Sequence, residues 1–263
     1  MTPNGKTHRL LTRLAVDKLL HPFQPFIIGQ KCLAPKMAIR FNIPLVFYGE
    51  QEAEYGTPIN EAMSSKRDWT FSSITERDEM FFGGVSYSSL KNNFNLSDND
   101  LSVYVPEDIN IITDKAIDFR YLGYYLKWHP QSNYYYSIQN TNFEVNPDGR
   151  TEGTYTKYAS LDDKIDGLHF YTWFIKTGRG RATDDAAIEV RNKIITREEA
   201  VALVKKYDGE FPKKYFKDIL NYLKISKNSF FKYCDKFRSP HIWKKINKKW
   251  HLRHTANFDG VDD

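Results

Sequence analysis

The sequence predicts an α/β fold, in which an incomplete Rossmann-like parallel sheet is followed by a helical C-terminal region. Residues 43–48 and 121–126 are apolar runs without alternation, and such runs are typical of strands buried on both faces of a parallel sheet. Apolar residues recur at helical spacing in the segments around these runs. Two strands are too few for a free-standing doubly wound sheet, so we expect the sheet to lack its front part.

The chain opens on two expected helices. Residues 10–20 have helical spacing and end before a His-Pro pair. A second helix is expected over residues 26–41, with a kink at Pro35. A chain that opens on a helix differs from doubly wound folds, which open on a strand and a phosphate-binding loop.

The first strand ends at a polar tip made of Tyr48, Gly49 and Glu50. Open α/β sheets bind ligands at the carboxyl ends of their strands, so these residues are candidates for a cofactor site. The Glu50 carboxylate is the candidate metal ligand. A surface glutamate after a strand has the same pattern, so position alone leaves both interpretations open.

The remaining elements follow from turn and capping signals. Residues 60–100 predict an insertion of short helices and loops, in which residues 81–86 (FFGGVS) form a turn. A helix is expected to begin within residues 134–138. Thr196 and Glu199 form a capping box for a helix that ends at Gly209. Further helices are expected from Pro212, and after a cap at Ser226.

Composition narrows the class of protein. The chain has 263 residues, 41% of them hydrophobic and 27% charged, which is typical of a soluble globular protein. It has no apolar run of about 18 residues and no signal-peptide pattern at its start, so we expect a cytoplasmic protein without a membrane span. Two distant cysteines, Cys32 and Cys234, indicate reduced thiols.

Positive charge is concentrated near the C-terminus. Residues 205–253 contain fifteen Lys/Arg and four Asp/Glu, a local excess of eleven, whereas the whole chain has a net charge of +5. A basic region of this kind suits a nucleic acid, a phosphorylated ligand, an acidic partner or an anionic membrane surface. Lysine-rich solvated helices give the same count without any partner.

The densest polar stretch covers residues 150–185. It places cations, carboxylates, hydroxyls and glycines around an aromatic run at residues 168–175. Glycines beside arginines let backbone amides and guanidinium groups approach an anion closely. The candidate binding residues are Arg150, Thr151, Glu152, Thr154, Lys157, Lys164, Arg179, Arg181 and Asp184. A solvated, salt-bridged loop is the alternative.

Four residues of this stretch are candidates for catalysis. Asp162, Asp163 and Asp166 offer carboxylates that can hold a metal, orient a substrate nitrogen or transfer protons. Asp162 and Asp163 equally fit the start of a helix, where the dipole favours carboxylates. His169 lies inside the aromatic run and is the histidine to test. No zinc-binding spacing of Cys and His is present in the sequence.

Several of these motifs together resemble the N-acetyl sugar amidotransferase family of surface-polysaccharide (LPS and O-antigen) sugar biosynthesis. They are YGE with EYG at residues 48–56, KWHP at 127–130, residues 150–155, 160–166 and 178–185, TREEA at 196–200 and KYDGE at 206–210. The resemblance runs nearly end to end. It implies an ATP pyrophosphatase fold of the PP-loop (HUP) type, with residues 1–185 as the remainder of a nucleotide- and sugar-binding domain and residues 186–263 as a basic helical region.

The resemblance also implies an activity. An N-acetyl amide oxygen of a nucleotide-linked sugar would be adenylated by ATP with Mg²⁺, and ammonia would then displace AMP to leave an acetamidino group. A HisH-like glutaminase and a HisF-like subunit would make and deliver the ammonia. The cations of residues 150–181 would bind phosphates of the sugar nucleotide, which is favoured over a nucleic-acid ligand.

The family's front third, with its Ser-Gly-Gly-Lys-Asp-Ser loop, has no counterpart in this sequence. That loop cradles the ATP phosphates, so we expect the chain to be the C-terminal two-thirds of such an enzyme, either truncated or a non-catalytic remnant. The alternatives are a basic binding module, in which residues 213–237 form a helix-turn-helix, and a scaffold for the glutaminase.

Overall fold

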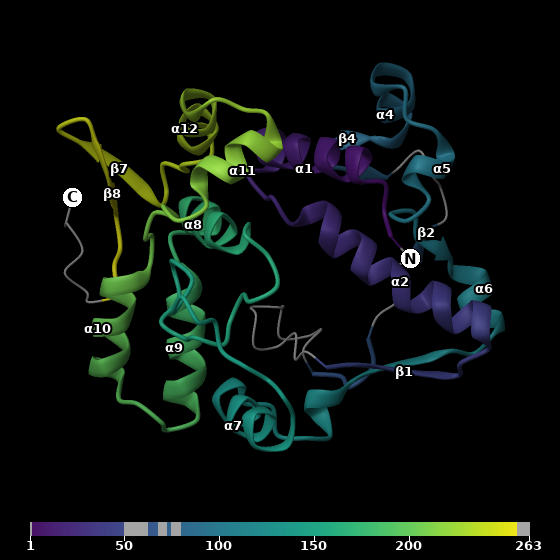
Figure 1. Cartoon of the computed structure of the whole chain (residues 1–263), viewed down its shortest axis with the longest axis horizontal. Coiled ribbons are helices and arrows are strands. Elements are labelled where there is room, and N and C mark those ends of the chain that lie inside the picture. The colour runs from purple at the N-terminus through teal and green to yellow at the C-terminus, as the bar shows by residue number, and fades with distance from the viewer. Residues whose placement is uncertain (1, 50–62, 68–72, 75–79, 257–263) are drawn as a thin grey trace. The chain divides into compact units, whose positions relative to one another are not determined.

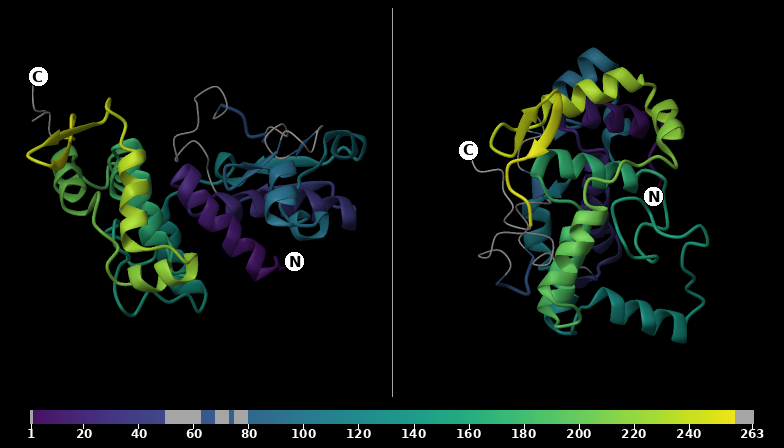
Figure 2. Two further views of the ribbon diagram at one scale, coloured as in Figure 1. Left: turned by 90° about the horizontal axis from the view of Figure 1, so that it is seen from above. Right: turned by 90° about the vertical axis from the view of Figure 1, so that its left-hand side faces the viewer.

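The computed structural model describes residues 2–49, 63–67, 73–74 and 80–256. Its contacts divide the chain into two compact units (Figures 1 and 2). One unit contains Met1–Leu19 and Phe23–Trp128, and the other contains Leu20–Pro22 and His129–Asp263. Cys32 and Cys234 are both buried and form no disulfide, as expected for reduced thiols.

The first unit begins with two helices, as predicted. Helix α1 spans Gly5–Leu19 and α2 spans Gln24–Phe41. Pro35 lies inside α2, and the helix ends at Asn42 in the left-handed conformation, whose N–H donates to the carbonyl of Ala38. Asparagine tolerates this conformation better than most residues, which explains where the helix stops.

A parallel strand pair confirms the α/β class. Strand β1 (Leu45–Tyr48) pairs in register with β6 (Asp118–Tyr121), and α6 (Ile109–Asp114) precedes β6. Ala38 of α2, Ile112 of α6 and Phe119 of β6 are almost fully buried together, with Val46 packed against them. Helices α2 and α6 therefore cover one face of the pair.

Two details of the predicted strands are wrong. Strand β1 is not buried on both faces, because Leu45 and Phe47 keep 46% and 47% of their surface exposed. The second strand does not run over residues 121–126, because β6 ends at Tyr121 and a 3₁₀ turn, η3, follows at Leu122–Tyr124. An apolar run does not distinguish a strand covered on both faces from one covered on a single face.

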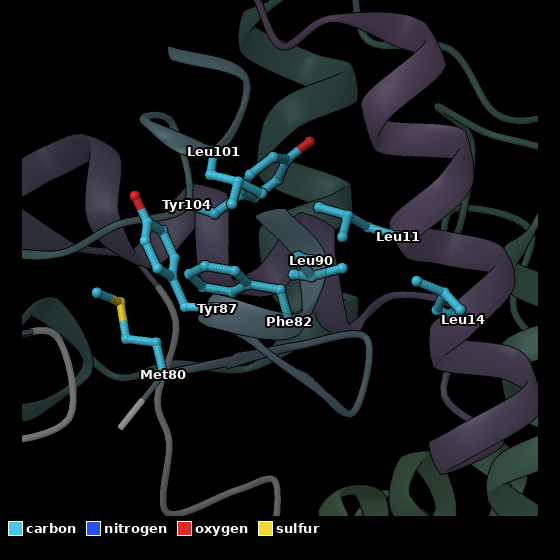
Figure 3. Close-up of a cluster of buried hydrophobic side chains, with 8 residues drawn as sticks. All are labelled: Leu11, Leu14, Met80, Phe82, Tyr87, Leu90, Leu101 and Tyr104. Atoms are coloured by element: carbon cyan, nitrogen blue, oxygen red, sulfur yellow. The ribbon is translucent and has the colours of Figure 1, made fainter. Parts of the chain in front are cut away.

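Short elements fill the described residues from 73 to 108, a range that includes much of the predicted insertion at residues 60–100. They are β2 (Ser73–Ile74), β3 (Phe81–Phe82), β4 (Val85–Ser86), α4 (Tyr87–Phe94), α5 (Asp98–Leu101) and β5 (Glu107–Asp108). The cluster in Figure 3 joins them to α1 through residues such as Leu11, Phe82, Leu90 and Tyr104. Truncating a fully buried leucine of this cluster costs about 2–5 kcal/mol.

The predicted turn at residues 81–86 is confirmed as the β3–β4 hairpin. Gly83 and Gly84 both have positive φ there. A Cβ at Gly83 would lie 2.7 Å from the Leu11 carbonyl oxygen, so only glycine lets the turn approach α1 so closely.

The second unit is mainly helical. Its helices are α7 (Pro130–Asn140), α8 (Asp166–Thr177), α9 (Arg181–Arg191), α10 (Arg197–Tyr207), α11 (Phe216–Leu223) and α12 (Lys227–Lys236). The caps predicted at Thr196 and Ser226 are confirmed. Helix α7 begins earlier than predicted, because His129 caps it, and α11 begins at Phe216 rather than at Pro212. The predicted domain boundary after residue 185 falls within α9.

A hairpin closes the described part of this unit. Strands β7 (Trp243–Ile246) and β8 (Lys249–Leu252) pair antiparallel. Helices α11 and α12 are joined at residues 224–226, as the helix-turn-helix alternative requires. Their inward sides contribute Phe216 and Phe230 to an aromatic cluster with ring centroids 5.3 Å apart. This packing explains the helix pair, and nucleic-acid binding by it stays a prediction.

Candidate active site

Glycines and a distant aspartate set the junction between α8 and α9. Gly178 ends α8 with φ of +75°, and a Cβ there would lie 2.6 Å from Ile242 Cγ2. Asp208 accepts hydrogen bonds from the N–H groups of Gly180 and Thr183, at 2.8 and 3.1 Å. It therefore caps the start of α9 from outside that helix, which fixes the position of Arg181.

The three predicted carboxylates come together where α8 begins. Oxygens of Asp162, Asp163 and Asp166 lie within 4.8 Å of one another. Asp163 Oδ1 accepts from the N–H groups of Ile165 and Asp166, at 2.5 and 2.9 Å. The helix-start interpretation of Asp163 is thus confirmed. The cluster also offers the oxygen donors that a hard divalent cation takes.

Asp166 is the most perturbed acid of this cluster. Burial, together with the negative charges of Asp163 and Asp162, raises the pKa of Asp166 to about 6, although the Ser160 hydroxyl and the charge of Arg181 oppose the rise. Burial also raises the pKa of Asp163. A carboxyl group with a pKa near neutrality is suited to accept and return a proton in a reaction.

His169 lies one turn along α8 from Asp166 and is half-buried, with its Nδ1 atom shielded from solvent. Its ring stacks on that of His21, with centroids 5.0 Å apart and planes 14° apart. Burial, together with smaller contributions from His21, Arg181 and Lys176, lowers the pKa of His169 to about 3. Burial likewise lowers the pKa of His21 to about 4. Both rings are therefore neutral at physiological pH.

Arg181, at the start of α9, pairs with Asp185 and also acts on the groups of α8. Its Nε donates to Asp185 Oδ1 at 2.8 Å, and its guanidinium lies 5.6 Å from the Phe170 ring centroid. The Arg181 charge also acts on the pKa values of Asp166, His169 and Tyr158. The structure thus brings five predicted residues into one neighbourhood: Asp162, Asp163, Asp166, His169 and Arg181.

Arg150 has a different environment from the one predicted. Its guanidinium donates two hydrogen bonds to Glu210, at 2.6 and 2.9 Å, and lies 4.5 Å from the Tyr207 ring centroid. A third bond goes to the Thr154 carbonyl at 3.1 Å. These contacts tie the 150–154 loop to the end of α10, so Arg150 is a structural clamp in this conformation.

Other predicted binding residues are also engaged within the protein. Arg179 pairs with Asp184 at 3.0 Å, and Lys164 lies 3.7 Å from Asp218. Thr151 donates to the Ser160 carbonyl, Glu152 accepts from the Lys214 N–H, and Thr154 donates to Asp185 Oδ2. Lys157 is exposed. Each predicted arginine is thus paired with a carboxylate of the protein, and the charge of Arg181 acts on the pKa of Asp166 in the acidic cluster.

The sequence interpretation missed several polar groups of this neighbourhood. Asp185 lies four residues after Arg181 and Glu189 four after Asp185, a helical spacing that places all three on one side of α9. Burial raises the pKa of Glu189, and burial with the nearby charges of Glu189 and Asp185 raises the pKa of Tyr155. Asp208 and Glu210 belong to the quoted motif at residues 206–210, but their partners lie about 30 to 60 positions away, which spacing cannot reveal.

The residues predicted to bind a cofactor, at the carboxyl end of β1, belong to the first unit. Tyr48 and Gly49 line an open hollow of about 510 Å³ with apolar residues of α2 such as Leu33 and Met37. The Arg67 guanidinium lies 4.1 Å from the Tyr48 ring centroid. Glu50, the predicted metal ligand, lies outside the described residues.

The fold and site define an α/β protein with a carboxylate-rich helix start in a mainly helical second unit. Residues 152–256 of that unit match the family model of the C-terminal domain of WbpG-like LPS biosynthesis proteins. The match includes the acidic cluster, Arg181 and the β7–β8 hairpin. No curated protein matches the chain. No described helix is both long and apolar enough to cross a membrane.

Proposed function

We propose that this chain forms the sugar-nucleotide side of an ATP-dependent amidotransferase that converts an N-acetyl group to an acetamidino group during LPS and O-antigen biosynthesis in the cytoplasm. The similarity of residues 152–256 to an LPS biosynthesis domain supports the pathway. The motif resemblance supports the reaction type. The observation that carries the proposal is the meeting of Asp162, Asp163 and Asp166 with Arg181 beside a half-buried His169.

The proposed reaction has two steps. The amide oxygen of the N-acetyl group attacks the α-phosphorus of ATP, and pyrophosphate leaves. Ammonia then adds to the activated carbon, loses a proton, and AMP leaves with the former amide oxygen. The first step develops negative charge on phosphate oxygens, and the second gives a positively charged nitrogen that must lose a proton. The two steps therefore need a cation and a proton acceptor in fixed positions.

Asp166 is the proposed proton acceptor. With a pKa of about 6 it is mostly ionised near neutral pH, yet basic enough to take a proton from the attacking nitrogen. Asp162 and Asp163 are proposed to hold the ammonium ion, or ammonia after deprotonation, against this carboxylate. The neutral His169 ring bounds the site on the α8 side and limits water there.

Arg181 is the proposed phosphate-binding cation. Asp185 orients its guanidinium through Nε, and a guanidinium recognises phosphate oxygens in a forked geometry. The three carboxylates also fit Mg²⁺ by donor type, and an ion held by them, as the alternative to the ammonium role, would supply positive charge toward the phosphates. Tyr48, Gly49 and Glu50 stay predictions for the ATP end, as do the HisH-like and HisF-like partners for ammonia supply.

A product assay tests the function. The full chain, alone and with the co-expressed glutaminase and ammonia-delivery subunits, is incubated with ATP, Mg²⁺, ammonium and a nucleotide-linked N-acetyl sugar. Mass spectrometry then follows the exchange of one oxygen for NH, and AMP is measured in parallel. We expect Asp166→Asn to lower kcat/KM by about 100-fold. Asp218→Asn, an exposed carboxylate on α11, is the matched control and should leave the rate unchanged.

A binding measurement isolates the sugar-nucleotide side. Calorimetry with the nucleotide sugar, without ATP or partners, should detect binding that Arg181→Ala weakens by about 10-fold or more. Lys232→Ala on α12 serves as the charge-matched control. Absence of binding by the unaltered chain, or equal affinity of the Arg181 variant, would contradict the assignment of this site.

A further inference from the structure

The last segment of the described chain carries charge of one sign. Residues 236–256 contain seven Lys/Arg and three His and no Asp or Glu. Asp235 precedes this segment, and the next carboxylates, Asp259, Asp262 and Asp263, lie outside the described residues. The active-site proposal uses none of these cations.

The β7–β8 hairpin sorts this segment into two faces. Trp243 pairs with Leu252 and Lys245 pairs with Trp250, so these four side chains lie on one face. Lys244 pairs with His251 and Ile246 pairs with Lys249, which places these four on the other face. Asn247 and Lys248 form the two-residue turn, both with positive φ.

The face with Trp243 and Trp250 packs against other elements of the second unit. Trp243 Nε1 donates to the Ile175 carbonyl at 2.7 Å, and its ring lies 5.4 Å from that of Phe174 in α8. Trp250 Nε1 donates to Asp235 at 3.0 Å. The Arg238 guanidinium lies 5.4 Å from each of the two indole centroids. These contacts hold the hairpin in one orientation and cover the Trp243 side of this face, while Lys245 near the turn stays exposed.

The opposite face, defined by Lys244, Ile246, Lys249 and His251, is directed to solvent. Lys249 and His251 are exposed, and Lys244 and Ile246 are half-buried. No carboxylate among the described residues pairs with Lys244, Lys248 or Lys249. In Figure 1 the hairpin stands at the edge of its unit, with the turn pointing away from α8 and α12. The fold therefore presents a rigid, purely cationic ribbon with one aliphatic side chain in it.

We propose that this face of the hairpin docks the chain onto the surface of an anionic lipid bilayer. Lysines attract a negatively charged membrane as point charges, without any specific geometry, and their aliphatic stems reach over an interface. Ile246 adds an apolar side chain between them. This property is independent of the proposed amidotransferase activity, and each can fail without the other.

A nucleic acid fits these observations less well. Adenine is read by the amide groups of Asn or Gln, and this face carries two lysines, one histidine and one isoleucine, which leaves guanine as the base that its lysines could contact. Stacking on bases requires an open aromatic face, yet the Trp250 ring has Arg238 at 5.4 Å and Lys245 at 5.0 Å from its centroid. The Ile246 side chain between the lysines favours the bilayer, because it can enter the bilayer interface, whereas a phosphate backbone uses the cations alone.

Vesicle co-sedimentation of the full chain tests the proposal. The probes are neutral phosphatidylcholine vesicles and vesicles containing phosphatidylglycerol, each in about 0.05 M and about 0.5 M salt. We expect binding only to the anionic vesicles, and release in high salt. The double variant Lys244→Gln/Lys249→Gln should partition about 30-fold more weakly, at about 1 kcal/mol for each lysine. Lys205→Gln/Lys206→Gln on α10 removes equal charge elsewhere and should bind as the unaltered chain does.

Three outcomes would overturn the proposal. These are no binding to anionic vesicles in low salt, equal binding to neutral vesicles, and equal loss of binding in both double variants, which would indicate net charge alone. The same variants are also titrated with duplex DNA. Tighter binding to DNA than to vesicles, lost specifically in the hairpin variant, would assign the surface to nucleic acid instead. Circular dichroism of both variants checks that the fold is intact.

Discussion

Arg150 and Glu210, sixty positions apart in the chain, form a two-point hydrogen-bonded ion pair that closes the loop beside the candidate site. Glu210 Oε2 also accepts from the Gly153 N–H at 3.1 Å. The Arg150 hydrogen bond lowers the pKa of Glu210, although partial burial opposes the shift. One carboxylate thus fixes both a side chain and the backbone of the 150–154 loop.

This pair predicts a stability effect that depends on geometry. Arg150→Ala should lower the free energy of unfolding by about 1–3 kcal/mol, because Glu210 loses its partner while it stays half-buried. Arg150→Lys should recover only a part, because an ammonium cannot make the two parallel bonds. Urea unfolding of both variants measures this. Full recovery by lysine would mean that charge alone matters here.

Asp166 predicts a pH dependence of stability with a definite sign. Its pKa is raised to about 6 in the folded state, above its usual value of 3.8, so the folded state favours the protonated acid. Its contribution is therefore fully present below about pH 4 and is lost as the pH rises through about 6, by about 2 kcal/mol. Asp166→Asn mimics the protonated acid and should remove this loss.

Unfolding of the unaltered chain, Asp166→Asn and the control Asp218→Asn at pH 4 and pH 8 measures the effect. The variant should lose less stability between these two pH values than the control does. If the two variants follow the same pH curve, the carboxyl group of Asp166 titrates normally and is a weaker candidate for proton transfer.

The stacked histidines His21 and His169 predict a pH dependence of stability with the opposite sign. Their folded pKa values, about 3 for His169 and about 4 for His21, lie below the usual 6.5. Their contribution to folding stability is therefore complete above pH 6.5 and is lost as the pH falls toward 4.

His169→Phe keeps an aromatic ring against His21. This variant should reduce the stability that is lost in acid by about 2 kcal/mol at pH 4.5. Acid unfolding, with exposed His241→Phe as control, measures it; equal curves would exclude a neutral His169.

The carboxylate and the histidines titrate in overlapping pH ranges with opposite signs. Between about pH 4 and pH 6 a rising pH removes the Asp166 contribution and restores the histidine contribution. The unaltered chain can therefore show a nearly flat stability curve in this range. Only the single variants separate the two effects, so they are informative together.

Local signals in the sequence located much of this structure. The capping box at Thr196 and the cap at Ser226 lie where their side chains predict them, because a cap depends on contacts within three residues. The glycine turn at residues 81–86 and the acidic cluster at the start of α8 are local in the same sense. Short-range chemistry was readable from spacing alone.

Long-range contacts were not readable in this way. Arg150 belongs to a polar stretch that suggests anion binding, but its actual partner, Glu210, lies beyond three helices, α8, α9 and α10. His21 seemed a helix terminator, and its stacking on His169 depends on tertiary packing. The exposure of Phe47 in β1 depends on which elements cover the sheet, which a hydrophobic run cannot specify.

Gly178 predicts a backbone effect on the hairpin anchor. Its φ of +75° disfavours a side chain, and a Cβ would lie 2.6 Å from Ile242 Cγ2 and 3.3 Å from Leu252 Cδ2. Gly178→Ala should therefore introduce conformational strain and also displace the base of the hairpin, which together lower the free energy of unfolding by about 2–4 kcal/mol.

Gly149→Ala is the matched control, because Gly149 has φ of +97° and nothing within 4 Å of the added Cβ. It should show only the strain, about 1 kcal/mol. Thermal unfolding and the fluorescence of Trp243 report the two effects, and equal losses in both variants would mean that Ile242 yields without displacing the hairpin.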